Sequence, residues 1–170
     1  MFEVGEYIIY GNHGVCKIED IGRLDISGFD KSKKYYKLQP LFSKSSTLYT
    51  PVDNDKVVMR RVITDEEARN LIEQIPETPL LWIENDKQRE EAYKEALRKH
   101  NCTEWIKIIK TLYVRKKERI SQGKKMTFID EKYLSISKDC LYGELSIALD
   151  MDREEVENLV ITRLESLNLV

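Results

Sequence analysis

Hydrophobic and polar residues alternate through the first third of the chain, and this period of two is typical of β-strands. The pattern predicts five short strands over residues 7–10, 15–21, 35–38, 47–50 and 57–59. Turn-forming residues separate them, among them the runs Gly11-Asn12-His13-Gly14 and Asp53-Asn54-Asp55. Short strands joined by tight turns favour a small, strongly bent antiparallel barrel of the SH3 or Tudor type.

After Val62 the hydrophobic period changes to that of an α-helix. Thr64 and Glu67 form a capping box that predicts the start of a helix, which ends before Pro76. Pro76 and Pro79 deny the backbone both a helix and a central strand, so they predict a linker. Beyond them the pattern predicts four helices over residues 85–99, 103–121, 130–149 and 152–166, with N-caps at Asn85, Thr103 and Asp152.

These elements predict an α+β chain of two domains. Residues 1–62 form the small antiparallel barrel, residues 63–79 form a helix and a proline-containing linker, and residues 80–170 form an all-α helical bundle. In the helix predicted over residues 103–121, apolar residues recur at helical spacing and make one face, which places Trp105 in the core.

The chain has 170 residues and a formal net charge of −2, which by itself gives no reason to expect nucleic-acid or membrane binding. The charge is nevertheless segregated. Residues 84–125 carry 13 basic and 7 acidic side chains, whereas residues 126–170 carry 4 and 10. The densest basic run is Arg115-Lys116-Lys117-Glu118-Arg119, followed by Lys124 and Lys125. This run is either the solvated end of a helix, where the macrodipole favours cations, or a patch that contacts phosphate.

The sequence offers little for catalysis. It contains no phosphate-binding glycine loop, no G-x-S-x-G and no metal-ligand spacing, so we expect no enzyme activity, no metal and no cofactor. Cys16, Cys102 and Cys140 are widely spaced, which predicts reduced thiols. His100 and Cys102 are two residues apart and would not face each other on a helix, which disfavours a thiol enzyme. We also expect no signal peptide and no membrane span.

The chain opens with the run Gly5-Glu6-Tyr7-Ile8-Ile9-Tyr10-Gly11-Asn12-His13-Gly14. Further blocks follow at Tyr35-Tyr36-Lys37-Leu38, Leu48-Tyr49-Thr50-Pro51, residues 105–113, Asp130-Glu131-Lys132-Tyr133 and Leu141-Tyr142-Gly143-Glu144-Leu145. In this order the blocks resemble those of the CarD/CdnL-like bacterial transcription regulators, over nearly the whole chain.

The resemblance implies a Tudor-like barrel that binds the β lobe of the RNA polymerase β subunit, a barrel that also occurs in the transcription-repair coupling factor. It further implies a helical domain that contacts the backbone and minor groove of promoter DNA without sequence specificity and so stabilises the open complex. The implied polymerase contacts are Arg23, Leu24, Tyr49, Thr50 and Pro51. The implied DNA contacts are Trp82, Lys87, Arg89, Arg115, Lys116, Lys117, Arg119, Lys124 and Lys125.

One departure from the family bears on the DNA contact. Many relatives wedge a Trp into the minor groove from the start of the first helix of the DNA-binding half, where this chain has Asp86. Trp82 lies four residues earlier, and it either takes over the wedge, staples the following helix or stands exposed to a partner. We favour phosphate contacts without a wedge, because an Asp facing the groove would repel phosphate.

The resemblance also implies a bacterial, cytoplasmic, nucleoid-associated protein, which we expect to be a monomer. The alternative is a protein-protein adaptor in which the barrel binds one protein and the helical domain serves for docking or dimerisation, with no contact to DNA.

Overall fold

The structure is a computed structural model of the chain, and it describes residues 1–166. The chain divides into two compact units, Met1–Val62 and Ile63–Val170. The first unit is a β-sheet and the second is built of helices, so the predicted α+β architecture is confirmed. Among the described residues, no helix combines the length and the apolar character needed to cross a membrane.

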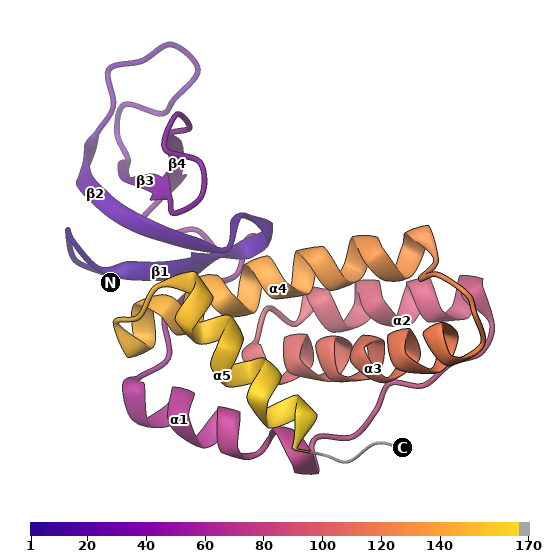
Figure 1. Cartoon of the computed structure of the whole chain (residues 1–170). Helices are drawn as coiled ribbons and strands as arrows, with labels where there is room; N and C mark the ends of the chain where they lie inside the picture. Colours follow the sequence, from indigo (N-terminus) through magenta and orange to yellow (C-terminus); the bar gives the residue numbers. More distant parts are fainter. Residues whose placement is uncertain (167–170) are drawn as a thin grey trace. The chain divides into compact units, whose positions relative to one another are not determined.

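Five antiparallel strands form the sheet of the first unit (Figure 1). They are β1 (Tyr7–Tyr10), β2 (Val15–Arg23), β3 (Lys34–Pro40), β4 (Leu48–Pro51) and β5 (Met59–Arg61), and the 3-10 turn η1 (Gly11–His13) joins the first two. Their order across the sheet is β4-β3-β2-β1-β5. Strands β4 and β5 therefore end the sheet, and its closure into a Tudor-like or SH3-like barrel stays a prediction.

One face of the sheet carries the core of the first unit. Ile8, Cys16, Ile18, Tyr36 and Leu38 form a buried apolar cluster. Ile8 is paired with Cys16, and Ile18 with Leu38, and directly paired residues project to the same face. A β-bulge between Ile18 and Asp20 interrupts the register of β2 against β3, which bends the strand over this core.

Strand β5 begins two residues later than predicted, at Met59 instead of Val57. The cause is the side chain of Asn54, which accepts from the backbone amides of Lys56 and Val57 at 3.1 and 3.2 Å and donates to the carbonyl of Val57 at 2.8 Å. An Asn that bonds the backbone just ahead of it stabilises a turn. Val57 is therefore held in the turn, although its side chain fits a strand.

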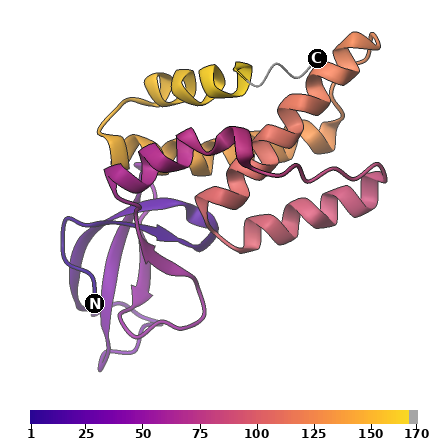
Figure 2. The ribbon, with the colours of Figure 1, turned by 90° about the horizontal axis from the view of Figure 1, so that it is seen from below.

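Two long helices, α3 (Cys102–Ser121) and α4 (Phe128–Leu149), pack together in the second unit. The other elements are α1 (Asp65–Glu73), the 3-10 turn η2 (Ile75–Glu77), α2 (Asp86–Arg98) and α5 (Arg153–Glu165). Figure 1 shows α2 beside α3 and α4, and Figure 2 shows α5 and α2 on opposite sides of α4. A buried cluster of Tyr93, Ala96, Ile108, Leu112 and Tyr133 joins α2, α3 and α4.

Residues 63–79, predicted as a helix and a linker, lie within the second compact unit. The capping box at the start of α1 is confirmed: the amide of Glu67 donates to Thr64 Oγ1 at 3.1 Å, and the amide of Thr64 donates to Glu67 Oε2 at 2.8 Å. Helix α1 packs on α4 and α5. The proline segment is also fixed, because Lys110 Nζ donates to the carbonyls of Pro76 and Thr78 at 2.8 and 2.6 Å.

Two helices begin at other residues than predicted. The N-cap of α3 is Asn101, not Thr103: Asn101 has an extended backbone, and its side chain accepts from the amide of Glu104 at 2.9 Å. Helix α4 begins at Phe128 after the N-cap Thr127, whose hydroxyl accepts from the amide of Asp130 at 3.2 Å. Asp130, expected as the first residue of this helix, is instead buried inside the bundle.

The N-cap of α3 can be tested by a matched pair of substitutions. We expect Asn101→Ala to lower the free energy of unfolding by about 1 kcal/mol, because it removes the acceptor for the first turn of α3. Thr103→Ala should change it by less than about 0.5 kcal/mol, since Thr103 is exposed and caps nothing. Urea unfolding followed by far-UV circular dichroism measures both. A larger loss for Thr103→Ala would place the cap where the sequence alone predicts it.

Candidate functional site

Strand β4 presents a backbone edge at one end of the sheet. The amide of Val52 donates to the carbonyl of Lys34 at 3.0 Å, which makes these two residues a hydrogen-bonded pair. Such pairs alternate along an antiparallel ladder, so Thr50 and Leu48 also bond towards β3, while the backbone groups of Tyr49 and Pro51 face outwards. Pro51 has no amide hydrogen, and its carbonyl accepts from the amide of Asn54 at 3.0 Å, so the edge offers the amide and the carbonyl of Tyr49.

Aromatic side chains lie beside this edge. The ring of Phe29 packs edge-on against Tyr49 and Tyr35, with centroid distances of 5.7 and 5.3 Å. The amide of Asp30 donates to the Tyr35 hydroxyl at 3.1 Å, which holds the loop between β2 and β3 over the strands. Tyr49 is itself half-buried. The edge therefore combines open backbone groups with an aromatic surface that is already fixed in place.

The register brings most of the predicted polymerase contacts together. Arg23 at the end of β2 pairs with Lys34, and the next residue of β3, Tyr35, pairs with Pro51 of β4. Arg23 is exposed and Leu24 is half-buried. Thr50 is different: it is 2% exposed, lies opposite the core residue Tyr36 and faces inwards. We assign Thr50 to the core and not to the predicted contact surface.

A buried ion cluster joins three helices of the second unit. Asp130 of α4 accepts from Arg89 Nε of α2 at 2.9 Å through Oδ1, and from Arg115 Nε of α3 at 3.1 Å through Oδ2. The hydroxyl of Tyr93 donates to Oδ1 at 3.3 Å. Arg89 and Asp130 have no exposed surface, and Arg115 is 8% exposed. The outer face of the cluster carries Asp86, whose carboxylate lies 2.8 Å from Arg89 Nη1.

The environment of Asp130 keeps its carboxyl ionised. Burial raises the pKa of this group, but the hydrogen bonds and charges of Arg89 and Arg115 outweigh burial and hold its pKa below the ordinary value of 3.8. Burial, together with the charge of Asp130, raises the pKa of Tyr93, so the Tyr93 hydroxyl stays protonated and donates. The cluster is therefore built around one permanent negative charge.

This cluster corrects two of the predicted DNA contacts. Arg89 is completely buried, and the guanidinium of Arg115 is paired with Asp130. Both arginines therefore hold the bundle together instead of binding phosphate. A signal for Arg89 was present in the sequence, because Arg89, Tyr93 and Ala96 share one face of a helix and all three are buried. Arg115 likewise continues the apolar face of Ile108 and Leu112.

Trp82 lies half-buried at the same end of the bundle. Its indole Nε1 donates to Glu84 Oε1 at 2.8 Å, and the guanidinium carbon of Arg115 lies 5.3 Å from the ring centroid. A hollow of about 210 Å³ adjoins the ring, lined also by Glu118, Arg119, Gln122 and Lys124 among others. The ring thus packs against Arg115 of α3 and forms one wall of a hollow that is lined by both acidic and basic side chains.

The remaining predicted DNA contacts lie at the surface. Lys87, Lys116, Lys117, Lys124 and Lys125 are exposed and Arg119 is half-buried. Arg119 Nε donates to the carbonyl of Lys125 at 2.6 Å, which ties the end of α3 to the loop before α4. Lys117 lies 4.6 Å from the ring centroid of Tyr113. We call these six residues the basic end of the helical unit.

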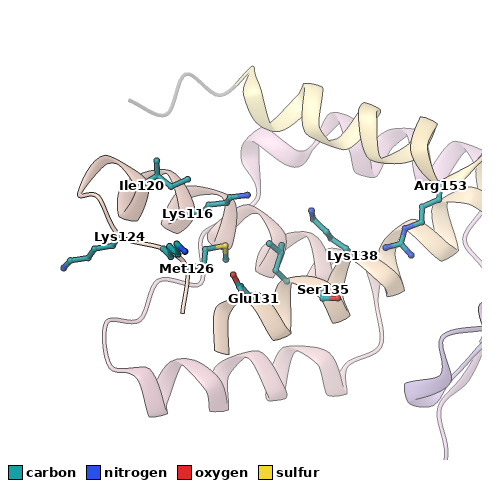
Figure 3. A pocket seen from close by; sticks show the side chains of 10 residues that line it. Lys116, Ile120, Lys124, Met126, Glu131, Ser135, Lys138 and Arg153 are labelled. Carbon is teal, nitrogen blue, oxygen red and sulfur yellow. The ribbon is translucent and has the colours of Figure 1, made fainter. Parts of the chain in front are cut away.

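A larger hollow of about 480 Å³ opens between α3 and α4 (Figure 3). Lys116, Lys124 and Lys125 line it together with Lys138 of α4 and Arg153 of α5. Sequence reasoning missed these last two cations, because they lie outside the basic run and within the acidic segment of residues 126–170. Spacing could not reveal them, since only the packing of α3, α4 and α5 brings them to this place.

Comparison with protein families matches both units. The CarD-like/TRCF RID domain matches residues 2–63, and the CarD C-terminal domain matches residues 77–161. The chain belongs to the CarD-like family. Domains of these two kinds suggest a transcription regulator that interacts with RNA polymerase, and CarD-like families are non-enzymatic regulators.

The cysteines of this CarD-like chain fit packing roles. Cys102 Sγ is buried and donates to Glu144 Oε2 at 3.1 Å, and Glu144 Oε1 also accepts from the amide of Ile63 at 3.0 Å. Burial raises the pKa of Cys16 to about 11, and burial with the nearby charges of Asp139 and Glu144 does the same for Cys140. Both thiols are protonated at neutral pH, the less nucleophilic form.

Removing the central carboxylate should strongly destabilise the CarD-like helical unit. We expect Asp130→Ala to lower the free energy of unfolding by about 3–5 kcal/mol, because two buried cations lose their counter-ion. Asp86→Asn is the matched control: Asp86 contacts the same Arg89, but its side chain is 69% exposed, so the loss should stay below about 1 kcal/mol. Urea unfolding measures both values.

The same carboxylate predicts a pH dependence. Since the pKa of Asp130 is lowered on folding, its contribution is complete above pH 3.8 and is lost as the pH falls through the folded-state value. The stability difference between wild type and Asp130→Ala should therefore shrink in acid. An equal difference at neutral pH and in strong acid would contradict the assigned charge.

Proposed function

We propose that this protein is a transcription regulator that binds the β subunit of RNA polymerase through the β4 edge and contacts promoter DNA through the basic end of the helical unit. By adding its own DNA contact to the polymerase, it stabilises the open promoter complex. The observation that carries the proposal is the match of both units to the two CarD-like domains. The geometry of each unit supplies a surface of the required chemistry.

The β4 edge supports the protein contact. An edge strand with open amide and carbonyl groups can pair with a strand of a partner, and the neighbouring side chains then select the partner. Here the backbone amide and carbonyl of Tyr49 supply the pairing groups. The Tyr49 ring, held by Phe29, supplies an apolar contact, and Leu24 and Arg23 extend it across the end of β2. Pro51 keeps the edge short, which limits pairing with unintended strands.

The basic end supports the DNA contact. Within residues 1–166, Lys87, Lys116, Lys124 and Lys125 take part in no ion pair with a carboxylate, so their charges remain available to phosphate. Cations of this kind position a protein on the duplex without reading its sequence. We propose that Trp82 contributes a wall of the surface and not a wedge, because its ring is stacked on Arg115 and its Nε1–H is engaged by Glu84.

A protein-protein adaptor without DNA contact is the second candidate. It is favoured by one specific observation: Arg89, Lys110 and Arg115 account for part of the basic excess of residues 84–125, and all three are buried and bonded inside the unit. Glu84 and Glu118 also lie beside Trp82 in its hollow. The adaptor hypothesis predicts no measurable affinity of the helical unit for duplex DNA.

The polymerase contact can be tested with purified protein and the β subunit of the host RNA polymerase. We expect Tyr49→Ala and Leu24→Glu each to weaken binding by about tenfold or more, because the first removes an apolar contact at the pairing edge and the second places a negative charge after β2 on the proposed contact surface. Phe42→Ala is the control, since Phe42 is an exposed aromatic residue of the same unit that lies outside β4. Wild-type protein that fails to bind the β subunit would refute this half of the proposal.

The DNA contact can be tested by its dependence on salt. For the double substitution Lys124→Glu with Lys125→Glu, the slope of log affinity against log salt concentration should fall by about 0.9 for each phosphate contact removed. The matched control is Lys94→Glu on α2, because Lys94 already lies 3.9 and 3.5 Å from the carboxylates of Glu90 and Glu91. Equal slopes for all three proteins would contradict the assigned contacts of Lys124 and Lys125, and a wild-type protein without measurable DNA binding would favour the adaptor.

A further inference from the structure

The 480 Å³ hollow between α3 and α4 has an apolar floor and a cationic rim. Ile120, Met126 and Leu134 form the floor. In Figure 3, Lys116 of α3 and Lys138 of α4 extend towards each other across the open space, and Lys124 points outwards from its end. The volume is within the range of about 300–1,000 Å³ that is usual for ligand sites.

The floor is apolar surface that the packing of the bundle leaves uncovered. Ile120 is 59% exposed on the last turn of α3, although the opposite face of that helix is deeply buried. Exposed apolar residues that gather next to a hollow and are rimmed by polar residues are typical of protein interaction sites.

The charge of the rim is unbalanced. Lys116, Lys124 and Lys125 form no ion pair within the described residues, whereas Lys138 lies 3.4 Å from Glu157 and Arg153 lies 2.5 Å from Asp139. Glu131 is the single carboxylate in the lining. An occupant must therefore bring negative charge to the α3 side of the hollow and apolar side chains to its floor.

We propose that this hollow docks an acidic amphipathic helix of a protein partner. Apolar side chains of such a helix, spaced by three or four residues, enter a groove between two helices, and its flanking carboxylates pair with the lysines of the rim. A DNA backbone would satisfy the lysines as well, but it would bring no apolar side chain to cover Ile120 and Met126. The combination of floor and rim therefore favours a protein.

The occupied hollow would control the DNA contact, an extension that rests on the proposed function. Lys116, Lys124 and Lys125 belong both to the rim and to the basic end that we propose for DNA. A partner helix that neutralises them would compete with promoter DNA, so the two could not bind at once. Docking at the hollow would in this way turn down the DNA contact while the β4 edge stays free to bind polymerase.

The test uses the full chain and two fluorescein-labelled helical peptides of equal negative charge. One carries Leu at positions i, i+3 and i+7 with Glu between them, and the other carries Ser in place of each Leu. Fluorescence anisotropy at physiological salt should show about tenfold or tighter binding of the Leu peptide, because its apolar side chains leave water. Equal affinities would mean that charge alone attracts the peptides, and the proposal would be wrong.

Neutral substitutions then locate the site. Ile120→Asn should weaken binding of the Leu peptide by about tenfold and leave binding of duplex DNA unchanged. Leu159→Asn on α5 is the control, since Leu159 is 40% exposed and lies outside the hollow. If Ile120→Asn weakens DNA as much as peptide, the hollow is part of the DNA surface and the proposal fails. A wild-type protein that binds the Leu peptide but no DNA would refute the DNA contact alone.

Discussion

The carboxylate of Asp130 holds together the three helices α2, α3 and α4 of the helical unit. It accepts from arginines of two other helices, and none of the three residues is more than 8% exposed. Buried charges are costly unless they are paired and hydrogen-bonded, so α2, α3 and α4 must meet in one arrangement for the cluster to form. That arrangement seats Trp82 on Arg115, and it sets the spacing of α3 and α4 across which the lysines of the hollow face one another.

Much of the fold follows from the sequence because local rules and tertiary packing agree. Alternation located the strands, and the capping box at Thr64 located the start of α1. The errors have physical causes. The side chain of Asn54 bonds the backbone before β5 and delays the strand, and Asn101 caps α3 two residues ahead of Thr103, a residue type that also forms N-caps. The closure of the sheet could not be predicted in the same way, since it depends on strands that are distant in the chain.

The candidate site was predictable only in part, since a charge in a sequence does not reveal its environment. Arg89 and Arg115 carry the charge that a phosphate-binding patch needs, but they lie on the helix faces that are buried in the core. Thr50 lies in a strand whose edge is open, and the alternation of β4 turns it inwards. Lys138 and Arg153 show the converse, since the folding of α4 and α5 adds them to a basic surface that no run of the sequence contains.

The two units of this CarD-like chain offer partners different chemistry. The β4 edge offers backbone groups and packed aromatic rings, which suit a protein strand, whereas the basic end offers mostly exposed positive charges, which suit a phosphate backbone of any sequence. Specificity for a promoter would then come from the polymerase. Within the part of the chain that the structure describes, no group of three or more His, Cys, Asp or Glu side chains could hold a metal ion.

The proposed function requires that the β4 edge meets the polymerase and that the basic end meets DNA. Site-specific photo-cross-linking in a reconstituted promoter complex tests both contacts, with the photoreactive amino acid at Tyr49 in one variant and at Lys125 in another. We expect position 49 to cross-link to the β subunit and position 125 to promoter DNA. Cross-links from position 125 to protein alone, or from position 49 to a subunit other than β, would contradict the proposal.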